Sequence, residues 1–254
     1  MTTDFSFARD VLDKLDGWVN LLASPLLPPR RVGAGADLSR PELSAHTPET
    51  VMLGKCVRAV SGLHVALGLA HLGYGAECAA LLRTVVDFCA EINAIGAALQ
   101  RGGELPPAVQ DLVKQYFTPR PTTPEQLEAE GRPRFPGRDD LMKAERHLAV
   151  MAQLDVQQGR RARRFNNMSL DAYVHGAYET TMELYDPQTG QFMMRGQLSS
   201  SHRQEFVTVV MLTLPRVVLA LELTAAAMRN TVVFQAARAA IRALATVEAL
   251  IRRP

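Results

Sequence analysis

Apolar residues recur at three- and four-residue steps along most of this chain, which is the period of an α-helix with one buried face. The pattern begins with an amphipathic helix over residues 4–23. Further helices are predicted over the ranges 48–72, 76–100, 106–117, 138–157, 168–185, 201–229 and 231–252. No segment of useful length alternates between apolar and polar residues, so the chain is expected to be all-α.

Two proline-rich stretches interrupt this pattern and are interpreted as long loops rather than domain boundaries. The first covers residues 24–48, and the second, "TPRPTTPEQLEAEGRPRFPGRDD", holds one expected turn of helix at 124–130. A turn signal, "DPQTG", precedes the only piece that reads as strand-like or irregular, "QFMMRG". We therefore expect one domain over 1–254, a multi-helix bundle with two Pro-rich loop excursions, in which helix 4–23 and loop 24–48 form an extension.

The composition is that of an ordinary soluble protein, with 47% apolar and 21% charged residues. A net charge of +2 gives no global attraction to nucleic acid or membrane. The N-terminal segment lacks a basic stretch followed by an apolar run, so no signal peptide is expected. The most apolar stretch, 206–228, contains Pro215, Arg216 and Glu222, and charges are costly near the centre of a bilayer. We expect a cytoplasmic protein that does not insert into membranes.

No metal or cofactor site is expected. Cys56, Cys78 and Cys89 are an odd number without metal-ligand spacing, which is typical of small apolar residues in a reducing compartment. His175 and Glu179 offer two ligands at helical spacing, and no further His or Glu pair completes a site. The chain has no phosphate-binding loop, no dinucleotide glycine motif and no nucleophile elbow.

A polar stripe runs along the helix predicted at 76–100, where Arg83, Asp87 and Glu91 follow one another at four-residue steps. One interpretation is a solvent-facing side with helix-stabilising ion pairs. The other is a groove inside the bundle, because the apolar face of this helix is wide for a surface helix. In that groove an Arg–carboxylate pair would orient His175, so we expect Arg83, Asp87 and His175 to approach one another.

A second group of polar residues lies in "SLDAYVHGAYETTMELYD", residues 169–186. His175 is either a hydrogen-bonded packing histidine or a proton-transfer group, and Glu179, one turn later, would fix its tautomer. The expected polar groove then comprises Arg83, Asp87, Glu91, Tyr173, His175 and Glu179.

The stretch "GLAHLGYGAECAALLRTVVDFCAEINAI" followed by "YVHGAY" resembles a group of uncharacterised bacterial helical proteins. These proteins carry an LLR-(S/T)-x-x-(D/E) helix and a later Tyr/His helix, and they are distantly similar to the HEPN superfamily. The matching positions are Leu82, Arg83, Thr84, Asp87, Tyr173 and His175. The resemblance implies a HEPN-like binding or regulatory module, in bacterial stress or phage defence.

The same resemblance raises the alternative of a metal-independent ribonuclease built on a dimer. Active HEPN ribonucleases pair an Arg with a His five to seven positions later, the Arg stabilising phosphate charge and the His transferring protons. Arg40–His46, Arg58–His64 and Arg195–His202 fit that spacing, and chance alone gives roughly two such pairs. Only the last pair lies at a loop-to-helix junction. The catalytic candidates are therefore Arg195, His202 and His175, the last combined with Arg164.

Basic residues are concentrated in "GRRARRFNN", and they are either a solvated loop or a contact for RNA or another anionic ligand. These residues are Arg160, Arg161, Arg163 and Arg164, with Arg238, Arg242, Arg252 and Arg253 as an extension.

A third function is a structural partner-binding bundle. We expect a homodimer through long apolar helices, most directly 206–228 or 231–251, because small residues allow close helix contact.

Overall fold

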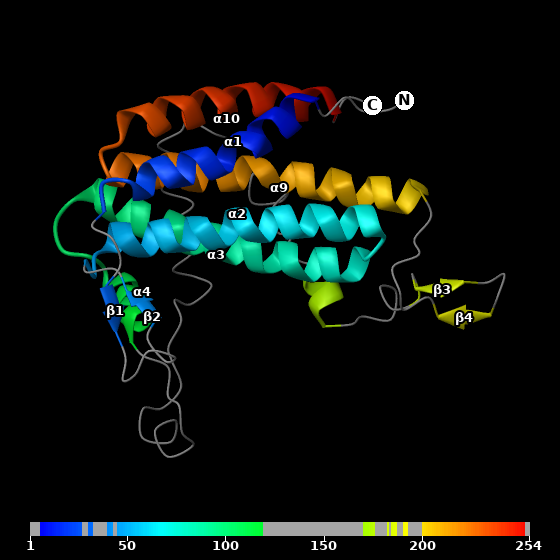
Figure 1. Ribbon diagram of the computed structural model, residues 1–254, viewed down its shortest axis with the longest axis horizontal. Helices are drawn as coiled ribbons and strands as arrows, with labels where there is room; N and C mark the ends of the chain where they lie inside the picture. Colours follow the sequence, from blue (N-terminus) through cyan, green and yellow to red (C-terminus); the bar gives the residue numbers. More distant parts are fainter. Residues whose placement is uncertain are drawn as a thin grey trace, which may run out of the picture.

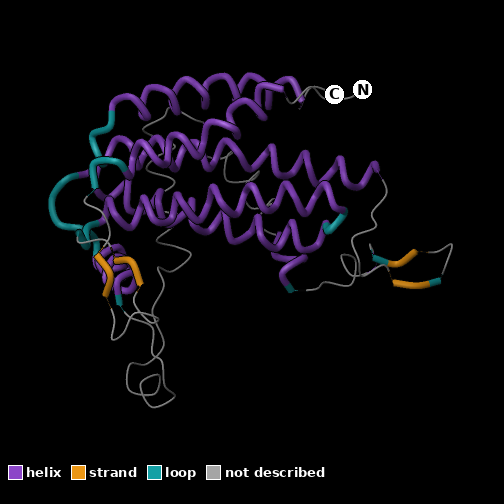
Figure 2. The backbone as a smooth tube through the Cα atoms, in the orientation of Figure 1, coloured by secondary structure: helices purple, strands orange, loops and turns teal. Residues whose placement is uncertain are grey.

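The protein is an all-α bundle, as the hydrophobic pattern predicts (Figures 1 and 2). The computed structural model describes residues 6–26, 30–32, 40–42, 45–118, 170–175, 182, 184–186, 190–192 and 200–251. Its main helices are α1 (Ser6–Ala23), α2 (Pro48–Leu72), α3 (Gly75–Arg101), α4 (Pro107–Phe117), α9 (Ser200–Ala227) and α10 (Thr231–Ile251). A short helix covers 170–174. The helices predicted at 124–130 and 138–157 lie outside the described residues.

The helices α2 and α3 form a hairpin, and α9 packs against both of them and against α10 (Figure 1). The helix α1 contacts α2, α9 and α10, which closes the bundle on its other side. Large buried side chains come from each of these layers, including Leu15, Met52, Ile92 and Leu221. The short helix α4 packs on α2 and α3 near one end of the bundle.

Capping residues position the ends of the helices. Thr47 accepts a hydrogen bond at its Oγ1 from the backbone N–H of Thr50 at 3.3 Å, and Pro48 follows as the first residue of α2. Gly73 ends α2 with φ of 85°, a left-handed conformation that costs glycine little. Arg229 takes the same role after α9 with φ of 56°, and Asn230 then caps α10 by accepting from the N–H of Val233 at 3.1 Å.

Within the part of the chain that the structure describes, two helices are long and apolar enough to cross a membrane by length and composition alone. They are α2 over Pro48–Leu72 and the His202–Ala227 part of α9. In the bundle, 56% and 61% of their most apolar windows are buried, so most of this apolar surface is covered within the chain.

Among the described residues, two small antiparallel ribbons lie outside the bundle (Figure 1). β1 (Arg30–Val32) pairs with β2 (Arg40–Glu42), and β3 (Tyr185–Asp186) pairs with β4 (Gln191–Phe192). The strand-like expectation for "QFMMRG" is thus confirmed at its first two residues. The helix predicted over 168–185 is wrong at its end, because Tyr185 is in a strand and the short helix ends in a turn at His175.

Candidate functional site: the polar face of α3

The polar stripe of α3 faces two different neighbours. The guanidinium of Arg83 bridges two carboxylates: its Nε donates to Oδ1 of Asp171 at 2.5 Å, and its Nη1 donates to Oδ1 of Asp87. Asp171 belongs to the short helix at 170–174, so this network ties that helix to α3. The third member of the stripe, Glu91, faces α2 instead.

Arg83 is strongly committed to its two partners. Burial alone would lower the pKa of Arg83, but hydrogen bonds and charges from Asp171 and Asp87 outweigh burial and raise it. One cation serves two carboxylates, so the network carries a net charge of about −1. Arg83 therefore offers little attraction to an anionic ligand.

The structure brings Arg83 and Asp87 together as predicted, but Asp171 completes the network in place of the His175 ring. The backbone N–H of His175 donates to the carbonyl of Asp171 at 3.0 Å, and its side chain is exposed. Tyr173 packs edge-on against Phe206, with ring centroids 5.8 Å apart. The segment is thus held on two sides and displays His175 and Val174 to solvent.

Glu91 forms a largely buried ion pair with Lys55 of α2, with side chains 14% and 10% exposed. Phe88 and Tyr116 flank the ammonium, with ring centroids 5.6 and 5.4 Å from its Nζ. Lys55 was not among the residues predicted to form a site. The signal that could have revealed it is a lysine inside an otherwise apolar stretch of helix, "TVMLGKCV".

Aromatic side chains surround the end of α4. Phe117 stacks on His46, with ring centroids 4.2 Å apart and an interplanar angle of 13°. Tyr116 meets Phe117 edge-on at 5.2 Å. Burial raises the pKa of Tyr116, and the positive charge of Arg58 partly offsets this.

Three more of the residues predicted to form a site, His202, Arg238 and Arg242, lie in α9 and α10. His202 is exposed in the first turn of α9. Arg238 lies 3.9 Å from Glu222 and above the ring of Phe234 at 5.5 Å, so it takes part in the α9–α10 contact. Burial raises the pKa of Glu222, and Arg238 and Arg242 lower it. Outside the described residues lie Arg160, Arg161, Arg163, Arg164, Glu179, Arg195, Arg252 and Arg253.

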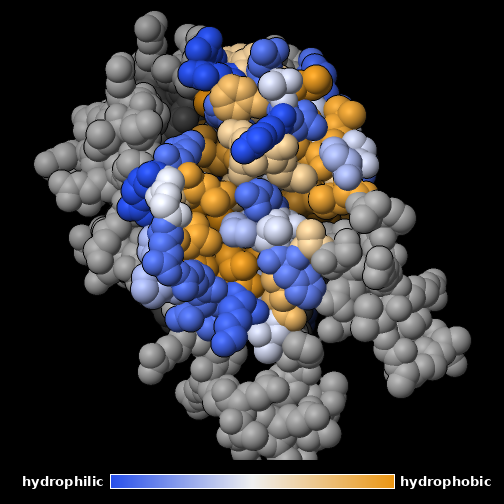
Figure 3. All heavy atoms as spheres, turned by 90° about the vertical axis from the view of Figure 1, so that its left-hand side faces the viewer, coloured by the Kyte–Doolittle hydropathy of each residue, from blue (hydrophilic) through white to orange (hydrophobic). Residues whose placement is uncertain are grey.

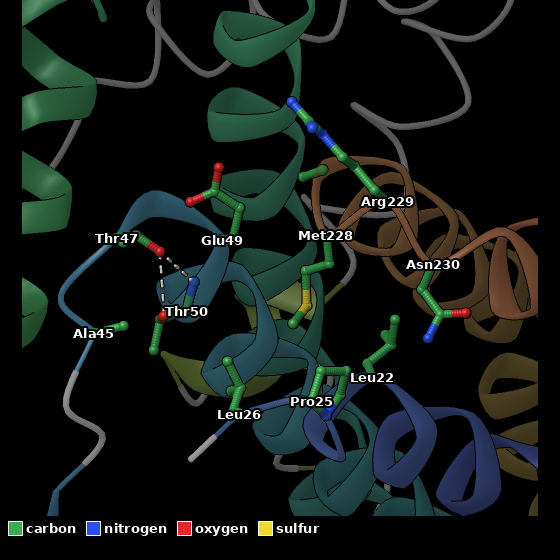
Figure 4. A pocket seen from close by; sticks show the side chains of 11 residues that line it. Leu22, Pro25, Leu26, Ala45, Thr47, Glu49, Thr50, Met228, Arg229 and Asn230 are labelled. Carbon is green, nitrogen blue, oxygen red and sulfur yellow. Dashed lines mark hydrogen bonds between the residues drawn. The ribbon is translucent and has the colours of Figure 1, made fainter.

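A pocket of about 430 Å³ opens at the end of the bundle, between the C-terminal end of α1, the start of α2 and the α9–α10 turn (Figure 4). Its apolar lining includes Leu22, Leu26 and Met228. Glu49 and Arg229 also line it and extend toward the same side in Figure 4. Figure 3 looks onto this end and shows hydrophobic surface between polar residues. None of the residues predicted to form a site lines this pocket.

The three cysteines are buried and unpaired. Burial raises the pKa of Cys56 and of Cys78 to about 12 and also raises that of Cys89. Within the described residues, no cluster of three or more His, Cys, Asp or Glu side chains could hold a metal ion.

No protein-family profile, no curated protein sequence and no solved structure matches this chain. Its function is therefore inferred from the fold and from the side-chain contacts described above.

Proposed function

We propose that the protein is a HEPN-like helical module that binds or regulates a partner, in bacterial stress or phage defence and in the cytoplasm. The contact between Arg83 and Asp171 carries this proposal. It joins the two parts of the pattern on which the resemblance rests, the helix with Arg83 and the Tyr173–His175 step, although Arg83 and Asp171 are 88 residues apart.

The segment 170–175 serves as the recognition element. Arg83 anchors it through Asp171, and Phe206 supports it through Tyr173. Its outer side presents Val174, which is 48% exposed, next to the imidazole of His175. With the net negative charge of the Arg83 network beside it, this surface favours a neutral or basic partner over an anion.

Homodimerisation is a further part of the proposal. Of the two ranges expected to form the dimer contact, 206–228 in α9 and 231–251 in α10, the packing of the bundle favours the second. The helix α9 already contacts α2, α3 and α10, so most of its surface is used within one chain. The outer face of α10 stays accessible, and Val232 at its start is 67% exposed. We therefore place the dimer contact on α10.

The experiment that tests the recognition element is site-specific photo-crosslinking in the cell of origin. A crosslinking residue at position 174 is expected to give a defined set of adducts whose yield falls several-fold when Arg83→Gln loosens the segment. Position 65 on α2 is the matched control, because Val65 is 53% exposed and lies outside the network. Identical adducts at both positions, or an unchanged yield at position 174 in Arg83→Gln, would contradict the proposal.

Incubation of the purified protein with mixed RNA separates the binding module from a ribonuclease. We expect little cleavage by the wild type. Robust cleavage that is lost in His202→Ala would replace the proposal with the ribonuclease of HEPN type. Cleavage lost only in His175→Ala would move the activity to the segment 170–175.

A further inference from the structure

A continuous group of rings lies where the start of α2 meets the end of α4. The stacked pair of His46 and Phe117 adjoins Tyr116, so three rings from two separate chain segments contact one another. His46 is exposed, and Tyr116 is 42% exposed. Phe117, which contacts both of these rings, is partly buried. Aromatic rings that reach water are typical of binding surfaces.

Basic side chains flank these rings on both sides. Arg58 on α2 is exposed and lies close enough to Tyr116 to act on the titration of its hydroxyl. Lys114 is exposed and precedes Phe117 by three residues, which places both on the same side of α4. Lys55 lies underneath and is neutralised by Glu91, so the outward positive charge comes from Arg58 and Lys114.

We propose that this surface, the aromatic–basic patch of Arg58, Tyr116, Phe117, His46 and Lys114, binds single-stranded nucleic acid. Every nucleobase has a π face that can stack on an aromatic ring, and each phosphate can pair with a basic side chain. Rings flanked by cations supply both interactions along one path. Bases in a duplex are already stacked on one another, so they cannot use the rings.

The combination of rings and cations distinguishes this ligand from an acidic peptide. A peptide carrying carboxylates would depend on Arg58 and Lys114 and would be indifferent to the ring of Tyr116. Nucleic acid depends on both. Asp111 is exposed one turn before Lys114. Removing its negative charge should strengthen phosphate binding, which tests whether the ligand is an anion.

Fluorescence anisotropy with a labelled oligouridine of about twelve nucleotides, and with a duplex of the same length, tests the proposal. The wild type binds the single strand more tightly than the duplex. Tyr116→Ala weakens binding by about tenfold, whereas Tyr116→Phe keeps it. Arg58→Gln and Lys114→Gln each weaken binding and reduce the salt dependence by about one phosphate contact, and Asp111→Asn strengthens binding.

Two controls separate these effects from altered folding and from general charge. His46→Ala removes a ring whose stacking partner is Phe117 at the end of α4, but it leaves Tyr116 in place against Gly54 of α2. It therefore weakens binding even if Tyr116→Ala loosens α4. Lys14→Gln removes the same charge at an exposed site on α1, a helix that packs on α2, α9 and α10, and it leaves the affinity unchanged. The proposal is wrong if the wild type binds no single strand, if both ring variants bind normally, or if Lys14→Gln weakens binding as much as Arg58→Gln.

This inference stands apart from the recognition element at 170–175. None of the patch residues belongs to the Arg83 network, so Arg83→Gln leaves oligouridine binding unchanged while it lowers the crosslinking yield at position 174. Failure of either proposal is therefore visible without affecting the other.

Discussion

The hydroxyl group of Tyr116 occupies the space in which a Cβ atom on residue 54 would stand. The absence of a side chain at Gly54 thus leaves the space on α2 in which Tyr116, at the end of α4, packs. We predict that Gly54→Ala displaces the Tyr116 ring and lowers the free energy of unfolding by about 1–3 kcal/mol, as overpacking does. Urea unfolding followed by circular dichroism measures the change.

Gly68 in the same helix is the matched control, because a Cβ there meets no atom within 4 Å. Gly68→Ala should raise the free energy of unfolding by about 0.5–1 kcal/mol through the better helix propensity of alanine. Equal effects at the two positions would show that the packing of Tyr116 does not require glycine at position 54.

The buried pair of Lys55 and Glu91 should be costly to break from one side. Lys55→Met leaves the Glu91 carboxylate buried without its cation, and we expect a loss of about 3 kcal/mol in the free energy of unfolding. The double variant Lys55→Met with Glu91→Leu should recover most of that loss, because neither charge is then buried. Chemical denaturation of the three proteins measures both values. A double variant no more stable than Lys55→Met would contradict this account.

The Arg83–Asp171 contact should control local opening rather than global stability. Its side chains are partly exposed, so the contact contributes roughly 1 kcal/mol or less. We predict that Asp171→Asn speeds hydrogen exchange at the amide of His175 by up to about fivefold, with little change in the unfolding midpoint. Asp87→Asn, which weakens only the contact within α3, should have a smaller effect on that amide. Equal effects of the two variants would overturn the anchoring role of Asp171.

The three buried thiols should be unreactive in the folded protein. Iodoacetamide at pH 8 is expected to label Cys56, Cys78 and Cys89 only after unfolding, because burial hinders access and disfavours the thiolate. Mass spectrometry of native and urea-treated samples measures the labelling. A fast-reacting cysteine in the native state would contradict the burial of that side chain.

The same raised pKa values make the free energy of unfolding depend on pH. Below about pH 9 these thiols are protonated in both states and contribute no slope. Between the ordinary value of 9.0 and the folded value of about 12, the unfolded chain loses protons that the folded chain keeps. Thiol ionisation therefore lowers the free energy of unfolding as pH rises above about 9. Cys78→Ala should flatten this slope in unfolding measured between pH 8 and 10.5, and an unchanged slope would contradict it.

Much of the fold could be predicted because its signals are local. The Thr47–Pro48 start and the Gly73 end of α2 are set by neighbouring residues, and the observed bounds agree with the predicted range 48–72. The Arg83–Asp87 pair follows from helical spacing alone. At Tyr185 the prediction failed, because tyrosine suits a strand as well as a helix.

The tertiary partners in the site could not be predicted in this way. Glu91 meets Lys55 only because α2 and α3 pair in one register, and helical spacing carries no information on that register. Asp171 reaches Arg83 across 88 residues of chain. The spacing along α3 therefore predicted that Arg83, Asp87 and Glu91 share one side of the helix. Which residues of other segments they contact depends on how the helices pack.

The order of the helices along the chain has a consequence for synthesis on the ribosome. The hairpin of α2 and α3 is complete at Arg101, but the helix that covers both, α9, ends at Ala227. At about 5–20 residues per second, roughly 6 to 25 s pass before that cover has been translated. During this interval the nascent hairpin exposes the apolar face that α9 later buries, and exposed apolar surface of this kind is what chaperones protect from aggregation.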